Sequence, residues 1–218
     1  MWSSPSGLAR DRPEHVSSRP FTVAHMHLAF DIFQGMGIAA AVGIRPFLPT
    51  LAVGALAGAS VQIHFNGTDY SFLQRGPFLA AIAVAAIVLG GAARRFSPER
   101  GAFAAVLVSA GAALGALLFA GSLARGHYTA WPGLIGGVAC AVVGAAATVP
   151  LLGRVRERLD QSAAAAVPAY AEMGAVLFAV LSVLGPPIGV IGLIALLWLL
   201  VAGRRREGRK YAGLRILR

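Results

Sequence analysis

Six long apolar segments constrain the fold of this chain more than any other feature. They cover residues 26–63, 71–93, 101–123, 130–150, about 163–184 and 186–203. Five of them are close to the roughly 20 residues that an α-helix needs to cross a bilayer. Charged residues make up only 13% of the chain, whereas soluble domains contain about 25%. The sequence therefore predicts an all-α, polytopic integral membrane protein with about six transmembrane helices, and it excludes a soluble enzyme.

The first segment is too long for a single unbroken crossing. As one helix, its 38 residues would measure about 57 Å, nearly twice the hydrocarbon thickness of about 30 Å. Proline lacks an amide donor and crowds the preceding helical turn. We therefore expect a helix break over Gly43, Pro46 and Pro49, and a corresponding irregularity at Pro150.

Positive residues lie at one set of segment ends. If residues 26–63 cross once in net terms, with their second piece dipping back or lying along the outer boundary, 16 Lys and Arg residues fall on one side and 2, Arg75 and Arg125, on the other. The positive-inside rule then places both termini in the cytoplasm. A disordered tail over 1–25, a transmembrane domain over 26–203 and a basic tail over 204–218 follow from this arrangement. A double crossing of the first segment would weaken the split to 13 against 5 and move the N-terminal tail outside.

The two halves of the chain can be aligned with one another. Residues 41–51 align with residues 142–152, so that Gly43 falls on Gly144 and Pro49 on Pro150. Two units, 26–123 and 130–203, would each contain three spans, and an odd number makes the second unit inverted. Inverted repeats are common in transporters, with the substrate site at the repeat interface. A chain rich in Ala, Gly and Leu also aligns with itself by chance, which is the alternative.

The motif at residues 43–49, Gly-Ile-Arg-Pro-Phe-Leu-Pro, carries a resemblance to a known family. Together with the Arg-rich C-terminal tail, it resembles a bacterial multi-pass membrane family that is catalogued only as a domain of unknown function. Many members read Gly-Leu-Asn-Ala-Tyr-Leu-Pro, so this chain differs at Arg45 and Pro46. The resemblance covers about residues 26–203 and implies a location in the bacterial inner membrane. It implies no activity.

Four ionisable residues lie within the apolar segments: Asp31, Arg45, Arg75 and Glu172. Such groups are costly in a bilayer unless they are paired or hydrated, so each is a candidate substrate-binding residue. Distance along the segments places Asp31 in the cytoplasmic half, Glu172 near the midplane and both arginines in the outer half. In the functional interpretation, the arginines receive an anion and Glu172 exchanges a proton. In the structural interpretation, the four charges neutralise one another and fix the helix register.

The break supports Arg45 as part of an anion site, because a half-helix that starts near Phe47 would direct its positive end at the same point. We therefore expect a transporter or translocator of a small anionic solute or phosphorylated lipid, coupled to protons through Glu172. The alternative is a non-catalytic membrane subunit or scaffold that packs against a partner protein.

The sequence shows no sign of catalytic or cofactor chemistry. No catalytic nucleophile and base converge, and we expect no enzyme activity. Cys140 is the single cysteine, and His25 and His27 lack further ligands, so no metal or cofactor is expected. The expected partners are membrane lipids, an anionic small molecule or lipid phosphate, and a second copy or another membrane protein, with no nucleic acid.

Overall fold

The computed structural model describes residues 20–92 and 101–214, with side-chain positions for residues 27–92 and 101–205. Within these ranges every regular element is a helix. The elements are α1 (Pro20–Ile44), α2 (Phe47–Gly58), the short 3₁₀-helix η1 (Ser71–Gln74), α3 (Gly76–Ala92), α4 (Gly101–Arg125), α5 (Trp131–Arg156), α6 (Gln161–Leu184) and α7 (Pro186–Leu214). The prediction of an all-α fold is confirmed.

Five of the described helices, α1, α4, α5, α6 and α7, are long and apolar enough to cross a membrane. The helices α2 and α3 are apolar but shorter, with 12 and 17 residues. These lengths and compositions are those of a multi-pass membrane protein. Where the sequence predicted about six spans, the described residues contain five helices long enough to span and two shorter apolar ones.

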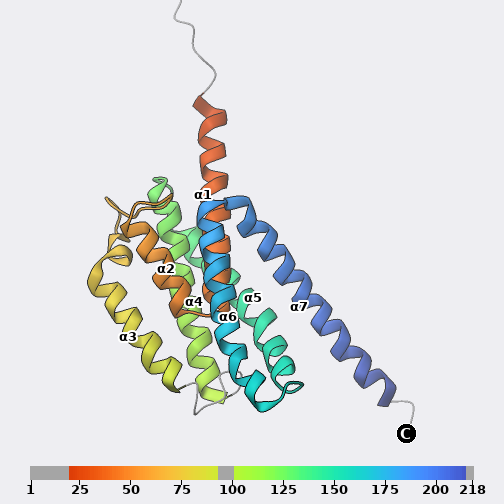
Figure 1. Cartoon of the computed structure of the whole chain (residues 1–218). Coiled ribbons are helices and arrows are strands. Elements are labelled where there is room, and N and C mark those ends of the chain that lie inside the picture. Colours follow the sequence, from red (N-terminus) through yellow and green to blue (C-terminus); the bar gives the residue numbers. More distant parts are fainter. Residues whose placement is uncertain (1–19, 93–100, 215–218) are drawn as a thin grey trace, which may run out of the picture.

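The centre of the bundle is α1, which packs against α4, α5, α6 and α7 (Figure 1). Small residues let these backbones approach closely, as is usual where helices pack in lipid. A Cβ atom on Gly115 of α4 would lie 3.3 Å from the carbonyl oxygen of Ala39 in α1. One on Gly137 of α5 would lie 2.6 Å from the Cα atom of Ala116 in α4. The apolar segments therefore form one bundle around α1.

The helices α1 and α2 form a re-entrant hairpin. In Figure 1, α1 enters the bundle from the upper end and α2 returns toward that same end. The last turn of α1 packs against the middle of α5, where a Cβ atom on Gly43 would lie 2.0 Å from the carbonyl oxygen of Ala141. The expectation that residues 26–63 cross once in net terms is therefore wrong. The chain reverses at Pro46, because proline cannot continue α1.

The two ends of the described chain lie at opposite ends of the bundle (Figure 1). The helices α1 and α7 both begin at the upper end, where Gly189 of α7 lies against Gly37 of α1, and α7 ends at the lower end. The expectation that both termini lie on one side is therefore corrected. Because α1 and α2 form a hairpin, the start of α1 and the end of α2 lie at the same end of the bundle. The start of α1 therefore lies at the opposite end from the C-terminal end of α7.

The structure does not show the inverted repeat that the alignment suggested. The helices α1 and α5, which the alignment pairs, both run from the upper to the lower end, since each is antiparallel to α4. The two aligned glycines both lie at the contact between α1 and α5. A Cβ atom on Gly43 would contact Ala141, and one on Gly144 would lie 2.3 Å from the carbonyl oxygen of Ala40. The aligned residues therefore lie where α1 and α5, which run in the same direction, pack closely against one another.

The helices extend beyond the segments at both ends of the chain. The helix α1 begins at Pro20, within the region expected to be a disordered tail, and residues 1–19 of that tail lie outside the described residues. At the other end, α7 continues to Leu214, so no helix ends at residue 204 where the basic tail was expected to begin. Residues 215–218 also lie outside the described part.

Candidate functional site

The break between α1 and α2 is short and well connected. The amide of Arg45 still donates to the carbonyl of Ala41 at 3.2 Å, as in a continuing helix. Pro46 then supplies no donor, and α2 starts at Phe47. The hydroxyl of Thr50 donates to the carbonyl oxygen of Pro46 at 2.6 Å, which holds the first turn of α2 against the break. The interruption is therefore confined to Arg45 and Pro46.

The other residues assigned to the break have different positions. Gly43 lies in the last turn of α1, where its lack of a side chain allows the contact with α5 described above. Pro49 lies in the first turn of α2, a position that needs no amide donor. Pro150 lies inside α5, which continues through it to Arg156. The expectation of a break at Pro150 is therefore wrong, because a transmembrane helix can continue through a proline where other groups satisfy the carbonyl that it leaves free.

A pocket of about 270 Å³ lies beside the break. Its wall consists of the residues 45–48, the last part of α3, Leu107 of α4 and Glu172 of α6. Leu48 and Ile87 line the pocket but remain 40% and 75% exposed. The pocket therefore opens sideways at the surface of the bundle, where a membrane protein meets lipid.

Arg45 and Glu172 are the two charged residues of this pocket. They come from different helices, and Glu172 lies at the middle of α6. The Nε atom of Arg45 and the Oε2 atom of Glu172 are both buried and have no hydrogen-bond partner among the described residues. A buried polar atom without a partner is costly unless water or a ligand satisfies it. The pocket thus offers an unused donor and an unused acceptor to an occupant.

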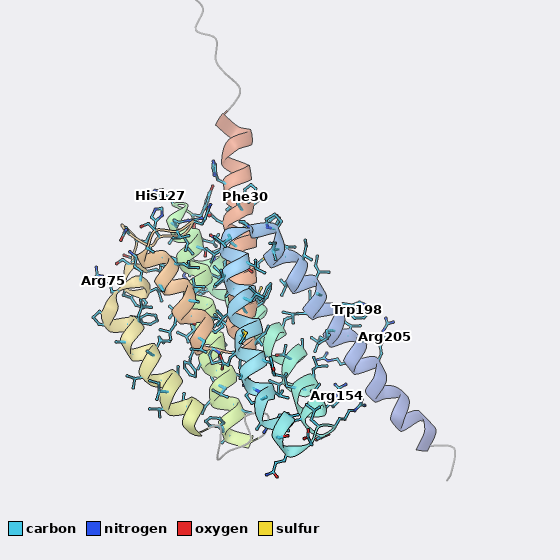
Figure 2. All side chains as sticks on the ribbon, viewed as in Figure 1. Phe30, Arg75, His127, Arg154, Trp198 and Arg205 are labelled. Carbon is cyan, nitrogen blue, oxygen red and sulfur yellow. The ribbon has the colours of Figure 1, made fainter. Side chains whose placement is uncertain are left out.

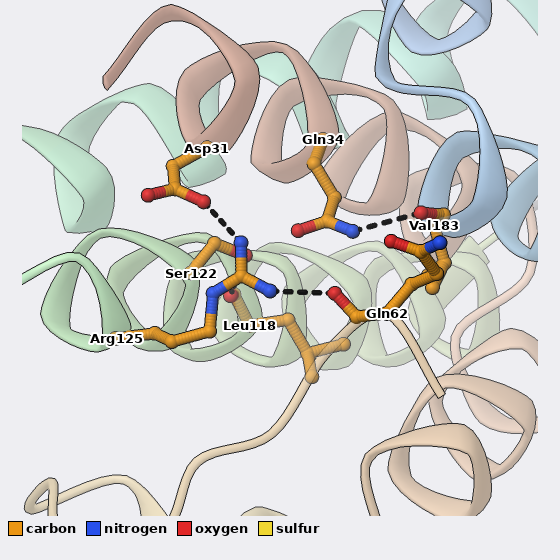
Figure 3. Close-up of polar contacts among 7 residues, drawn as sticks. All are labelled: Asp31, Gln34, Gln62, Leu118, Ser122, Arg125 and Val183. Atoms are coloured by element: carbon orange, nitrogen blue, oxygen red, sulfur yellow. Dashed lines mark hydrogen bonds and ion pairs between the residues drawn. The ribbon is translucent and has the colours of Figure 1, made fainter. Parts of the chain in front are cut away.

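Asp31 lies away from this pocket, near the upper end of the bundle. Its carboxylate pairs with the guanidinium of Arg125 at the end of α4, and Arg125 also donates to the carbonyl oxygen of Gln62 at 2.6 Å (Figure 3). Asp31 was expected in the cytoplasmic half of its span and Arg125 on the outer face, and their pairing corrects this placement. Asp31 is a partner in an ion pair that joins three segments.

Arg75 is also separate from the pocket. It precedes α3, and Figure 2 shows it at the outer edge of the bundle. Its Nη2 atom lies 3.4 Å from the hydroxyl of Ser71 in an exposed hydrogen bond. The four candidate residues therefore divide into one pair that shares a pocket, Arg45 and Glu172, and two that lie elsewhere.

Gln34, a buried polar residue of α1, was not among the residues predicted for the site. Its side-chain amide donates to the carbonyl oxygen of Val183 at 2.9 Å, near the end of α6 (Figure 3). Its Oε1 atom is buried without a partner among the described residues. A signal was present, because Asp31 and Gln34 are three residues apart and therefore lie on one helix face. Arg125 was missed because the analysis treated it as a loop residue.

Within the part of the chain that the structure describes, no group of three or more His, Cys, Asp or Glu side chains is close enough to hold a metal ion. Cys140 is buried in the interior beside Phe119 and Leu123. The chemistry of the pocket is therefore that of one guanidinium, one carboxyl group and apolar walls.

No family model matches this chain, and no curated protein or solved structure is significantly similar to it. The resemblance at residues 43–49 remains a prediction.

Proposed function

We propose that the chain is a membrane carrier for a small anionic solute or a phosphorylated lipid, and that the pocket beside the α1–α2 break is its substrate site. One observation carries this proposal. Arg45 and Glu172, from distant parts of the sequence, line the same pocket at mid-bundle, and each has a buried polar atom without a hydrogen-bond partner.

The break is well suited to hold an anion. The first turn of α2 carries the amides of Phe47 and Leu48, which have no partner within the helix, and its positive dipole end lies beside the guanidinium of Arg45. An anionic group placed there would receive charge-assisted hydrogen bonds from both sources. Interrupted helices with half-helix ends at mid-depth form substrate sites in many transporters.

Glu172 supplies the complementary group. A carboxyl group opposite the anion site can accept a substrate ammonium or carry a proton that moves with the substrate. The second role would make the carrier proton-coupled. Because the pocket opens between Leu48 and Ile87, an amphiphile with an anionic head could enter from the bilayer, which supports the lipid form of the proposal.

The charge distribution supports an orientation in the bacterial inner membrane. With α1–α2 re-entrant, 13 Lys and Arg residues belong to the connections and tail at the lower end and 5 to those at the upper end, with Arg45 between them. The positive-inside rule then places the lower end, with the C-terminus, in the cytoplasm. The N-terminus would lie on the other side.

Ligand-dependent thermal stability of the purified protein tests the proposal. The probes are inorganic phosphate, glycerol phosphate, lysophosphatidic acid and short-chain carboxylates. A probe at 100 times its dissociation constant should stabilise the protein by about 2.7 kcal/mol, a shift of about 5–10 °C. Arg45→Gln should abolish the shift, and Glu172→Gln should reduce it.

Arg75→Gln is the matched control, because it removes an arginine at a span end that does not line the pocket. It should leave the shift unchanged. Counterflow of the stabilising probe in proteoliposomes should then be lost in Arg45→Gln and retained in Arg75→Gln. The proposal fails if no probe shifts the stability, or if all three variants respond alike.

A second candidate, a subunit that packs against another membrane protein, is favoured by α7. Only 11% of the apolar stretch of α7 is buried inside the bundle, the smallest share among the five long helices. Native mass spectrometry on complexes extracted with a mild detergent tests this alternative, which requires a partner bound in a fixed ratio.

A further inference from the structure

The helices α5 and α7 separate toward the lower end of the bundle. Near its start, α7 is tight against α1, where a Cβ atom on Gly189 would lie 2.6 Å from the carbonyl oxygen of Phe33. Farther down, α7 diverges from the bundle (Figure 1). The space between the two helices holds a pocket of about 210 Å³ lined by Arg154 of α5 and Arg204 of α7.

Two arginines from two helices therefore line one crevice. Arg154 is held in place, since its Nε atom donates to the carbonyl oxygen of Pro150 at 3.2 Å. Its Nη2 atom would lie 3.6 Å from a Cβ atom on Gly203, so its outer end reaches across to α7. Phosphate oxygens fit the planar guanidinium geometry, so two arginines that line one crevice can hold a phosphate from two sides.

The crevice has a long apolar part as well. Leu199 lines both the arginine pocket and a second pocket of about 260 Å³. The second pocket lies farther up α7 and is walled by Phe178, Ile44 and Leu196, with no charged residue. A free phosphate ion would use only the arginine end. An acyl chain attached to the phosphate would pass Leu199 and enter this second, apolar pocket between α1, α6 and α7.

Trp198 marks the depth of the crevice. It lines a neighbouring pocket that also contains Arg154, and its side chain is 69% exposed (Figure 2). Tryptophan is enriched at the level of the lipid headgroups. Basic crevices between helices at this level are suited to anionic headgroups.

We propose that the crevice between α5 and α7 is a binding site for an anionic phospholipid. Its phosphate is held between Arg154 and Arg204, and one acyl chain lies along Leu199 toward Phe178. This site is separate from the pocket at Arg45 and does not depend on the carrier function proposed above.

Fluorescence quenching of Trp198 tests the site directly. Replacing Trp2 and Trp131 by Phe leaves Trp198 as the single tryptophan. In detergent micelles, phosphatidylglycerol with brominated acyl chains should quench Trp198 at an effective concentration about tenfold lower than brominated phosphatidylcholine, because the trimethylammonium group of phosphatidylcholine offsets the charge of its phosphate. Equal quenching by both lipids would overturn the proposal.

Two variants of the crevice should abolish the preference. Arg154→Gln/Arg204→Gln removes both guanidinium groups, whereas Gly203→Phe fills the crevice and retains them. The matched control is Arg158→Gln/Arg205→Gln, which removes the same charge from exposed positions that do not line the crevice. It should retain the preference, and an equal loss in the control would mean that net charge alone attracts the lipid.

An inorganic phosphate arm distinguishes the two sources of phosphate. In the single-tryptophan protein, phosphate at physiological concentration should leave the preference for brominated phosphatidylglycerol unchanged, because it lacks the acyl chain. If phosphate removes the preference, the crevice is a site for free phosphate and the lipid proposal is wrong.

Discussion

Asp31 of α1 forms an ion pair with Arg125, the last residue of α4. The side chains of Arg125 and Asp31 are 20% and 8% exposed, so the pair is partly buried. Arg125 also holds the loop after α2 through the carbonyl of Gln62. This one cluster ties the entry of the re-entrant hairpin, the segment that follows it and the end of α4 to the same end of the bundle.

Removing either charge of this pair should destabilise the protein. We expect Asp31→Asn and Arg125→Gln each to lower the unfolding free energy by about 1–3 kcal/mol, because each leaves a partly buried charge without its partner. The double variant should lose less than the sum of the two. Thermal unfolding in detergent measures this double-mutant cycle. Strictly additive losses would show that the two side chains do not interact.

Cysteine labelling should report the opposite placement of the two chain ends. In a Cys140→Ala background, His27→Cys, Asp69→Cys and Gln161→Cys place one thiol at each of three exposed positions. An impermeant maleimide applied to intact cells should label residues 27 and 69 and should reach residue 161 only after lysis. If residue 27 instead behaves like residue 161, the first segment crosses the membrane once and the hairpin is wrong.

Gly43 should not tolerate even a methyl group. In Gly43→Ala the new Cβ atom would lie 2.0 Å from the carbonyl oxygen of Ala141, and backbone cannot move aside as a side chain can. We expect a loss of about 1–3 kcal/mol or more from overpacking. Gly174→Ala in α6 is the control, since its Cβ atom would meet nothing within 4 Å. It should stabilise the helix by about 0.5–1 kcal/mol, and equal effects at both sites would contradict the close packing of α1 on α5.

Pro150 should be replaceable, because α5 already continues through it. Pro150→Ala supplies an amide donor for the carbonyl of Ala146 without changing the path of the helix, so the melting temperature should rise. Pro46→Ala should instead lower it, because Pro46 lies at the reversal between α1 and α2. Both are measured by thermal unfolding, and a large loss at Pro150 would contradict the expectation that α5 does not need this proline.

The local features of the helices followed from sequence patterns. The apolar segments predicted the starts of α4, α5, α6 and α7 to within about two residues, and the prolines predicted the break after Ile44. Both features depend on interactions within a short stretch of chain, namely the length of apolar sequence and the missing amide of proline. The side-by-side placement of Arg45 and Glu172 was a hypothesis at that point, and their roles remain predictions.

The direction of α2 and the partners of the charged residues came only from the tertiary structure. After Pro46 the chain can continue across the bundle or turn back, and no local pattern distinguishes the two paths. Packing of Gly43 against Ala141 stops α1 at the middle of α5, and the pair of Asp31 with Arg125 fixes the end from which α1 enters. The sequence by itself thus determined which stretches are helical and apolar, because these properties are local. The tertiary structure decided how the stretches are threaded, since that depends on contacts between residues far apart in the chain.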